Sequence, residues 1–334
     1  MKTLLCLYSF SGLKCFKMTP STPFAIAIHG GAGTITRASL TPELERQYRQ
    51  ALQQALAAGY RLLEKGSSAL EAVQAATVVL EDNPLFNAGR GSVFNKAGKH
   101  EMDAALMDGR TLHAGAITGV RNVRNPILLA REVLQHSDHV FLCQAGAEEF
   151  ALNRGLRFEP DEYFFSQQRY EQWQQLRDSD IYQLDHSQEP VPTEGKKFGT
   201  VGAVAVDGAG NVAAATSTGG MTNKNFNRIG DSPVIGAGTY ANNRTCAVSC
   251  TGHGEFFIRS VVAYDISCLM EYKGLSLQEA CDVVVHQKLV QLGGEGGLIA
   301  VSPNGHIAMP FNSEGMYRGS WAAGQAPYVA IYKD

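Results

Sequence analysis

The sequence predicts a layered α/β protein, and three observations support that fold class. Short apolar segments typical of buried strands form two groups, one in each half of the 334-residue chain, and each group is accompanied by helical segments. The strands and helices do not alternate regularly and no internal repeat is visible, so neither a regular βαβ fold nor a repeat protein is expected. Glycine accounts for 35 residues, which indicates many tight turns and close backbone contacts.

The N-terminal half begins with an apolar strand at 24–28 that runs into HGGAG at 29–33. Two helices follow, and each has an N-cap signal. Thr41 precedes Pro42, and Ser68 has Glu71 three residues later, the spacing of a capping box. A glycine-rich bend, NPLFNAGRGSVF at 83–94, comes next. The further expected elements are strands near 101–107 and 111–118 joined by an Asp-Gly turn, a helix from Pro126, a strand at 140–143 and a helix near 145–154.

A polar, glutamine-rich stretch separates the halves, and we interpret residues 183–198 as a linker. The C-terminal half starts with a tight hairpin of strands at 200–206 and 212–218. Small residues occupy both faces of this hairpin, so another layer must pack closely on each side. The remaining expected elements are a strand at 245–251, helices at 254–272 and 276–292, a hairpin at 297–311 and a terminal strand at 328–332.

The composition excludes several classes of protein. The formal net charge is −3 and no basic cluster occurs, so no nucleic-acid partner is expected. No apolar run reaches the ~18 residues of a membrane span, so no membrane partner is expected. Seven scattered cysteines without a CxxC pair indicate neither a disulfide framework nor a zinc ribbon. Cys246 and Cys250 are expected to be core thiols, and the cysteine pattern favours the reducing cytoplasm.

Residues 1–17 need separate treatment because MKTLLCLYSFSGLKCFK faintly resembles a signal peptide. It lacks a small-residue cleavage site, Lys14 and Lys17 interrupt the apolar run, and Met18 follows directly. We therefore interpret 1–17 as an upstream start or a disordered leader, with a secretory signal as the alternative.

The pair Gly199-Thr200 lies where the linker meets the buried hairpin. A threonine hydroxyl is a poor nucleophile unless a base lies beside it. If the 199–200 bond is cleaved, the new α-amine of Thr200, with a pKa of about 8, can serve as that base. Gly199 suits such a step because it tolerates a strained backbone and leaves its carbonyl open to attack by the Thr200 hydroxyl. Taken alone, a Gly-Thr pair before a strand most often marks a structural threonine.

Longer segments across the chain resemble one family, the plant-type asparaginases or isoaspartyl peptidases of the N-terminal-nucleophile hydrolases. The matching segments are IHGGAG (28–33), NPLFNAGRGSVF (83–94), HEMDAALMDG (100–109), GTVGAVAVD (199–207), ATSTGGMTNK (215–224), GDSPVIGAGTYAN (230–242), SCTGHGE (249–255) and FNSEGMYRG (311–319). They extend from about residue 24 to the C-terminus, and bacterial members are especially similar.

The resemblance implies an αββα four-layer sandwich that cleaves itself into an α subunit, 18–199, and a β subunit, 200–334. It implies assembly as a dimer of such αβ heterodimers. It also implies hydrolysis of L-asparagine to L-aspartate and ammonia, and of β-aspartyl dipeptides, without an organic cofactor.

The resemblance also implies roles in catalysis. Thr200 is similar to the family's nucleophile, and Thr218 is placed to hydrogen-bond its hydroxyl or amine, although Thr218 could instead cap the strand end. Thr251 and Gly252 correspond to the oxyanion-binding residues, with a plain glycine turn as the alternative.

For substrate binding, Arg228 and Asp231 complement the α-carboxylate and α-ammonium of an aspartyl substrate, unless they form only a surface salt bridge. The other implied substrate-binding residues are Ile229, Gly230, Thr251, Gly252, His253, Gly254 and Asn87. Among these, Gly254 contributes a carbonyl, and Asn87 approaches Thr200. His253 is not an essential base, and we expect it to face solvent or to support the site from behind.

The segment 80–90 resembles the loop that holds a structural Na⁺ in bacterial members, mainly through backbone carbonyls. The corresponding residues are Leu80, Glu81, Asn83, Phe86, Ala88 and Arg90. Arg90 departs from the aliphatic residue usual there, so it either alters the ion preference or points to solvent.

Three other functions fit the sequence less well. Glycosylasparaginases share the fold and nucleophile, but they are usually secreted and carry disulfides. A protease of the same superfamily needs extra surface for a protein substrate, and a non-enzymatic binding protein would not need the intact Gly-Thr pair. HGGAG lacks the P-loop pattern, so phosphate binding is not indicated.

Overall fold

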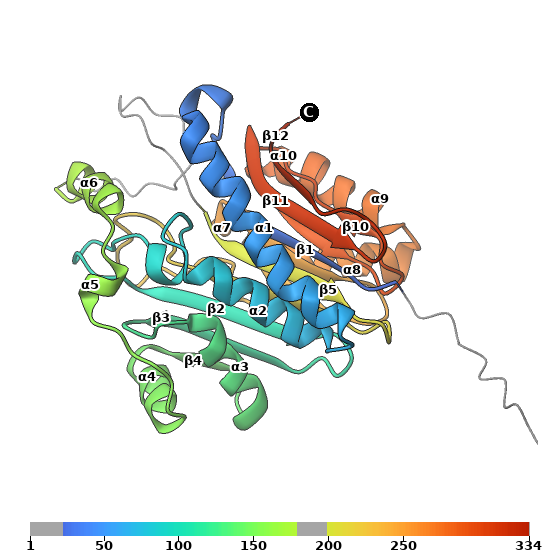
Figure 1. Cartoon of the computed structure of the whole chain (residues 1–334), viewed down its shortest axis with the longest axis horizontal. Coiled ribbons are helices and arrows are strands. Elements are labelled where there is room, and N and C mark those ends of the chain that lie inside the picture. The colour runs from blue at the N-terminus through green and yellow to red at the C-terminus, as the bar shows by residue number, and fades with distance from the viewer. Residues whose placement is uncertain (1–22, 179–198, 334) are drawn as a thin grey trace, which may run out of the picture.

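The computed structural model describes residues 23–178 and 199–333, and in these residues two β-sheets lie between helices (Figure 1). The mixed α/β class expected from the sequence is confirmed. The expected leader at 1–17 and the linker at 183–198 lie outside the described residues.

The larger sheet has the strand order β12-β11-β1-β5-β6-β2-β3-β4. Neighbouring strands are antiparallel except for β3 and β4, which are parallel. Strands from the two halves of the chain alternate in blocks across it. Their bounds are β1 Ala25–Gly33, β2 Met102–Asp108, β3 Ala114–Val120, β4 Phe141–Cys143, β5 Val201–Val206, β6 Val212–Thr218, β11 Gly315–Ala322 and β12 Tyr328–Tyr332.

The smaller sheet has the order β10-β9-β8-β7. Its strands are β7 Thr239–Ala241, β8 Ala247–Gly252, β9 Gly296–Val301 and β10 Ile307–Ala308. This sheet packs on the larger one, with β8 against β5 and β6 and with β9 against β1. Both faces of the central hairpin are therefore buried, as its small residues predict. Val201, Ala203 and Ala205 enter the core on the helix side, whereas Val204 and Val206 enter the core between the sheets.

Helices cover the outer faces of both sheets (Figure 1). The larger sheet contacts α1 Pro42–Glu64, α2 Ala69–Glu81, α3 Pro126–His136 and α4 Gln144–Asn153, and the smaller sheet contacts α7 Gly254–Ser260, α8 Val262–Lys273 and α9 Leu277–Asp282. The short helices α5 Asp161–Phe164, α6 Gln167–Leu176 and α10 Leu289–Leu292 complete the set. Within the described ranges, none of the helices combines the length and the hydropathy needed to cross a bilayer.

The predicted helix starts are confirmed. The Thr41 hydroxyl accepts a hydrogen bond from the amide of Leu44, and Ser68 and Glu71 form a complete capping box. The helix expected at 254–272 has the predicted ends within one residue, but the expectation that it is continuous was wrong. Val261 adopts the left-handed conformation, with φ 49°, and separates α7 from α8. A β-branched residue gives no sequence signal for such a break.

Three further segments differ from the expected elements. The helix expected at 276–292 is present, but residues 283–288 form a π-helical segment. Strand β7 was not predicted, because it has only three residues. Strand β11 was not predicted, because glycines and polar residues interrupt its apolar pattern. The first strand is longer than expected and includes HGGAG, with a β-bulge between His29 and Gly31.

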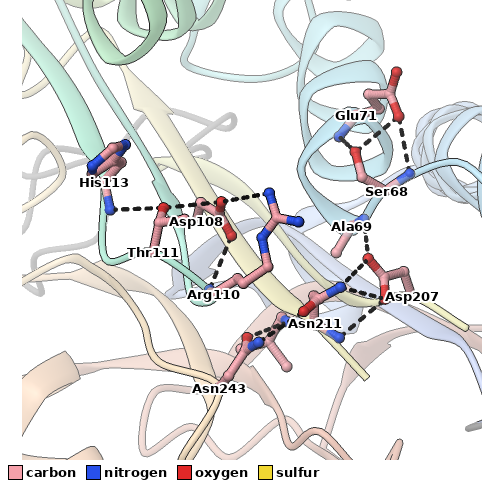
Figure 2. A network of polar contacts seen from close by, with 11 residues as sticks. Ser68, Ala69, Glu71, Asp108, Arg110, Thr111, His113, Asp207, Asn211 and Asn243 are labelled. Carbon is pink, nitrogen blue, oxygen red and sulfur yellow. Dashed lines mark hydrogen bonds and ion pairs between the residues drawn. The ribbon is translucent and has the colours of Figure 1, made fainter. Parts of the chain in front are cut away.

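A polar network fixes the turn of the central hairpin (Figure 2). The carboxylate of Asp207 accepts hydrogen bonds from the amide of Ala69, at the start of α2, and from Asn211. The side chain of Asn243, in the turn between β7 and β8, accepts from the amide of Val212 at 2.9 Å. These bonds tie the hairpin to a helix and to the second sheet. They hold the register of β5 and β6 and so the position of Thr200 at the opposite end of β5.

Candidate active site

Thr200 lies directly before β5 and is 8% exposed, and Gly199 precedes it. The pairing of Val201 with Ser217 places Thr200 opposite Thr218, the last residue of β6. The Thr200 hydroxyl is 3.2 Å from the Thr218 hydroxyl and 3.3 Å from the Ser232 hydroxyl. The hydroxyl is therefore held by two others, in a pocket lined in part by Gly199, Thr200, Thr218 and Ser232.

A buried histidine holds the backbone of Thr200. His29 Nδ1 lies 3.0 Å from the carbonyl oxygen of Thr200, and Nε2 lies 2.9 Å from the hydroxyl of Ser249. A carbonyl only accepts, so Nδ1 carries the proton and Nε2 accepts from Ser249. Burial lowers the pKa of His29 to about 3, although the hydrogen bond to the Thr200 carbonyl acts to raise it. The ring is therefore neutral at pH 7.

The bonds continue between the two sheets. The Ser249 hydroxyl is 2.7 Å from that of Thr216, and the Thr239 hydroxyl is 2.6 Å from Thr216 and 3.0 Å from the carbonyl oxygen of Ser232. A side chain at Gly202 would collide with Ser249 and His29, so this glycine makes the network possible.

Thr251 and Gly252 end β8, next to the helix α7. Gly252 lines the same pocket as Thr200. Its φ is 151°, and a Cβ there would collide with the backbone of Glu295 and of Gly296, where β9 begins, so the position requires glycine. The buried hydroxyl of Thr251 has no hydrogen-bond partner among the described residues.

Arg228 and Asp231 both line the pocket, as the sequence predicts, but they do not pair with each other. Arg228 instead forms two hydrogen bonds of 2.8 Å to the carboxylate of Glu255, a residue that sequence reasoning missed. Asp231 is 3% exposed and one of its carboxylate oxygens, Oδ2, has no partner in the described ranges. Burial raises the pKa of Asp231 to about 7, although the charge of Arg228 opposes that change.

The remaining predicted binding residues fall into two groups. Gly230 lines the pocket, and Gly254 lies against both Arg228 and Asp231. Ile229 is exposed, and it does not line the pocket. His253 is partly exposed, with Nε2 3.6 Å from Glu255.

Asn87 supports the site from behind. Its amide donates to the carbonyl of Gly220 at 2.7 Å, and its carbonyl oxygen accepts from the amide of Val93 at 3.0 Å. Gly220 in turn donates its amide to the Thr218 hydroxyl at 3.0 Å. Asn87 thus positions the turn that positions Thr218, and within the part of the chain that the structure describes it forms no hydrogen bond to Thr200.

The predicted ion loop at 80–90 is closed on itself. A Cβ at Gly89, which has φ 51°, would lie 2.6 Å from the carbonyl oxygen of Glu81, so only glycine allows the two ends to meet. Arg90 is exposed, and its guanidinium lies 5.4 Å from the ring centroid of Tyr163. The Arg90 side chain is therefore both exposed and stacked near an aromatic ring. Among the described residues, no cluster of His, Cys, Asp or Glu side chains could bind a metal.

The side chain of Glu81 is itself buried beside the site. It accepts hydrogen bonds from the Ser217 hydroxyl at 2.6 Å and from the amide of Ile127 in α3 at 2.9 Å. Burial raises the pKa of Glu81 to about 8, against the lowering effect of these bonds. The neutral carboxyl group of Glu81 thus links its own helix, α2, to α3 and to β6. Its contact in β6, Ser217, directly precedes Thr218.

Three residues of the site were not predicted, although each lies within or at the end of a motif. His29 and Ser232 lie inside quoted motifs, IHGGAG and GDSPVIGAGTYAN, but nothing in the chain order shows that both approach Thr200. Glu255 ends the motif SCTGHGE, and only the folded structure shows that it reaches Arg228.

Comparison with known proteins gives consistent matches. The asparaginase family matches residues 22–331. The chain is 56% identical to the isoaspartyl peptidase of Salmonella typhimurium over 310 residues, which cover 92% of this chain and 98% of the relative. It is 54% identical to the isoaspartyl peptidase of Escherichia coli, covering 92% and 96%, and 40% identical to the human isoaspartyl peptidase/L-asparaginase, covering 90% and 92%.

Proposed function

The chain belongs to the asparaginase family and is an amidohydrolase, and we propose that it hydrolyses L-asparagine and β-aspartyl dipeptides with Thr200 as an N-terminal nucleophile. The main support is the environment of the Thr200 hydroxyl. This hydroxyl lies within hydrogen-bond distance of the Thr218 and Ser232 hydroxyls, in a pocket that Arg228 and Asp231 also line. The names of the relatives favour this activity over glycosylasparaginase.

Maturation starts with attack of the Thr200 hydroxyl oxygen on the carbonyl carbon of Gly199. The C–N bond of residues 199 and 200 breaks, an ester to the Thr200 oxygen forms, and the nitrogen becomes the α-amine of Thr200. Water then hydrolyses the ester and leaves a carboxylate on Gly199. The product is an α subunit ending at 199 and a β subunit beginning at 200. The Gly199 position supports this step, because the residue lies in the pocket beside the hydroxyl.

Turnover uses the same oxygen. The Thr200 hydroxyl attacks the side-chain amide carbon of the substrate while the α-amine takes the hydroxyl proton. The amine then protonates the leaving ammonia or amino acid, and water hydrolyses the aspartyl ester to release L-aspartate. Thr251 and Gly252 are assigned to the developing oxyanion, and the unpaired hydroxyl of Thr251 supports that role.

Substrate charge selects the aspartyl group. The guanidinium of Arg228 binds the α-carboxylate, and Asp231 binds the α-ammonium. The buried, unpaired oxygen of Asp231 supports the second role, because an isolated buried carboxylate oxygen is costly until a cation reaches it.

The loop at 80–90 fits a structural Na⁺ held by backbone carbonyls of Leu80, Glu81, Asn83, Phe86, Ala88 and Arg90. The close approach of Gly89 to the Glu81 carbonyl supports such a ring. Replacing NaCl with tetramethylammonium chloride at equal ionic strength should lower the melting temperature. The variant Arg90→Ala should keep that dependence, because only its carbonyl is used. Equal melting temperatures in the two salts would contradict the assignment.

The family also suggests the larger organisation. We propose a four-layer αββα order, which is supported by helices packed outside both sheets, and assembly of two αβ heterodimers. The five cysteines in the described residues are free, which fits the cytoplasm.

The test of this function is cleavage. Purified protein should give two fragments on denaturing gels, and intact mass spectrometry should place the break between Gly199 and Thr200. Thr200→Ala should stay in one piece and hydrolyse neither L-asparagine nor a β-aspartyl dipeptide, since it lacks the attacking oxygen. Full activity in an uncleaved chain would overturn the mechanism.

A further inference from the structure

Glu255 forms the closest charged contact of the substrate-binding arginine. Its two carboxylate oxygens accept from Nε and Nη2 of Arg228, each at 2.8 Å, which is the side-on arrangement of a bidentate pair. The side chain of Arg228 is 19% exposed, so this pair is only partly screened by water. One edge of the guanidinium is therefore occupied before any substrate binds.

A second carboxylate lies near the same arginine and is not paired with it. An added Cβ at Gly254 would lie 2.9 Å from Arg228 Nη2 and also 2.9 Å from Asp231 Oδ1. The two charged groups thus flank one glycine. Within the described residues no ion pair joins them, and Asp231 keeps an oxygen, Oδ2, without a partner.

We propose that Glu255 is a positioning residue that keeps Arg228 from pairing with Asp231, so that both remain available for the two charges of the substrate. This inference rests on the proposed function. Opposite charges that flank one glycine in a partly desolvated pocket would otherwise pair with each other. Such a pair would occupy the groups meant for the substrate's carboxylate and ammonium.

The charge states agree with this arrangement. Partial burial raises the pKa of Glu255, but the hydrogen bonds and charge of Arg228 outweigh it, so the net pKa is lowered and the residue is ionised at pH 7. Burial lowers the pKa of His253, the other nearby base, more than Glu255 raises it. Because a neutral His253 forms no ion pair with Glu255, the carboxylate of Glu255 pairs with Arg228 alone among the described residues.

The experiment compares the cleaved wild-type enzyme with Glu255→Ala and Glu255→Gln. The matched control is Glu271→Gln, which removes the charge from another Arg–Glu pair, with Arg244, at 2.7 Å. For L-asparagine and a β-aspartyl dipeptide, we expect KM to rise on the order of 10- to 100-fold in Glu255→Ala and less in Glu255→Gln, which keeps one acceptor oxygen. We expect kcat within about threefold of wild type, because the groups around Thr200 are untouched. Glu271→Gln should retain the wild-type KM.

Autocleavage and melting temperature separate positioning from folding. Self-cleavage uses neither substrate charge, so all variants should cleave as wild type does. If Glu255→Ala fails to fold or cleave, the isosteric Glu255→Gln carries the test. An unchanged KM in the folded variants, or a fall in kcat at constant KM, would overturn the proposal. Inactivity of the wild type on both substrates would instead reject the proposed function.

Discussion

Thr200 is constrained on its hydroxyl by Thr218 and Ser232, and on its carbonyl by His29. If the proposed cleavage occurs, the hydrogen bond to this carbonyl gains importance, because Thr200 then loses its covalent connection on the N-terminal side. The hydroxyl pair follows from the sequence, since a tight hairpin of known register places Thr200 opposite Thr218. The contacts of Ser232 and His29 depend on packing between separate segments, which chain order does not specify.

Gly31, in the first strand, lies against Gly199 at the proposed cleavage site. Its φ is 113°, and a Cβ there would lie 2.7 Å from the nitrogen and 3.1 Å from the Cα of Gly199. Gly31→Ala should therefore displace Gly199 from the Thr200 hydroxyl and slow self-cleavage by tenfold or more, on the order of 1.4 kcal/mol in the barrier. Time-resolved denaturing gels of freshly made protein measure this rate.

The matched control is Gly66→Ala. Gly66 also has a positive φ, 84°, but no atom lies within 4 Å of its added Cβ. Gly66→Ala introduces the same kind of backbone strain as Gly31→Ala, but its added Cβ contacts no other atom. The Gly66→Ala variant should therefore cleave at the wild-type rate. If Gly31→Ala also cleaves normally, contact between the two glycines has no part in maturation.

At the scale of elements, the sequence predicts correctly those features that depend only on residues close together in the chain. The capping box at Ser68, and the Asp-Gly turn between β2 and β3, involve neighbours in sequence. The break at Val261 has another origin: the amides of Ala263 and Tyr264 bond to carbonyls at 237 and 236, in a distant loop. Tertiary hydrogen bonds offset the strain of that residue, and no periodicity could indicate them.

Glu81 joins three elements, and its protonation should influence their stability. Its pKa is about 8 when folded, against an ordinary value of 4.5, so unfolding releases a proton between these pH values. The free energy of unfolding should therefore fall as pH rises from about 4.5 to about 8. Glu81→Gln is neutral in both states and should lack this contribution.

Melting temperatures measured from pH 5 to 9 at constant NaCl test this expectation. The difference between Glu81→Gln and wild type should shift in favour of the variant as pH rises to 8. The exposed Glu64→Gln, at the end of α1, should follow the wild-type curve. Parallel curves for Glu81→Gln and wild type would show that the buried carboxyl does not titrate as described.

At the scale of the molecule, the sheet order determines what cleavage can separate. In the order β12-β11-β1-β5-β6-β2-β3-β4, strands before residue 199 and strands after it occur in alternating blocks. Backbone ladders join the two parts at β1–β11, β1–β5 and β2–β6. The sequence predicted two groups of strands, but it could not show that they interleave, because strand order depends on pairing between distant segments.

The two fragments should consequently stay together after cleavage. Separating them would expose the unpaired amides and carbonyls of three ladders together with the cores on both faces of β5 and β6. Cleaved protein should elute as one species in native size-exclusion chromatography and give two bands only under denaturing conditions. Residues 18–199 and 200–334 expressed apart should each fail to fold, whereas co-expression should restore a cleaved-like, active enzyme with Thr200 at a chain start. Native separation of the fragments, or a folded β fragment on its own, would contradict the interleaved sheet as the source of their association.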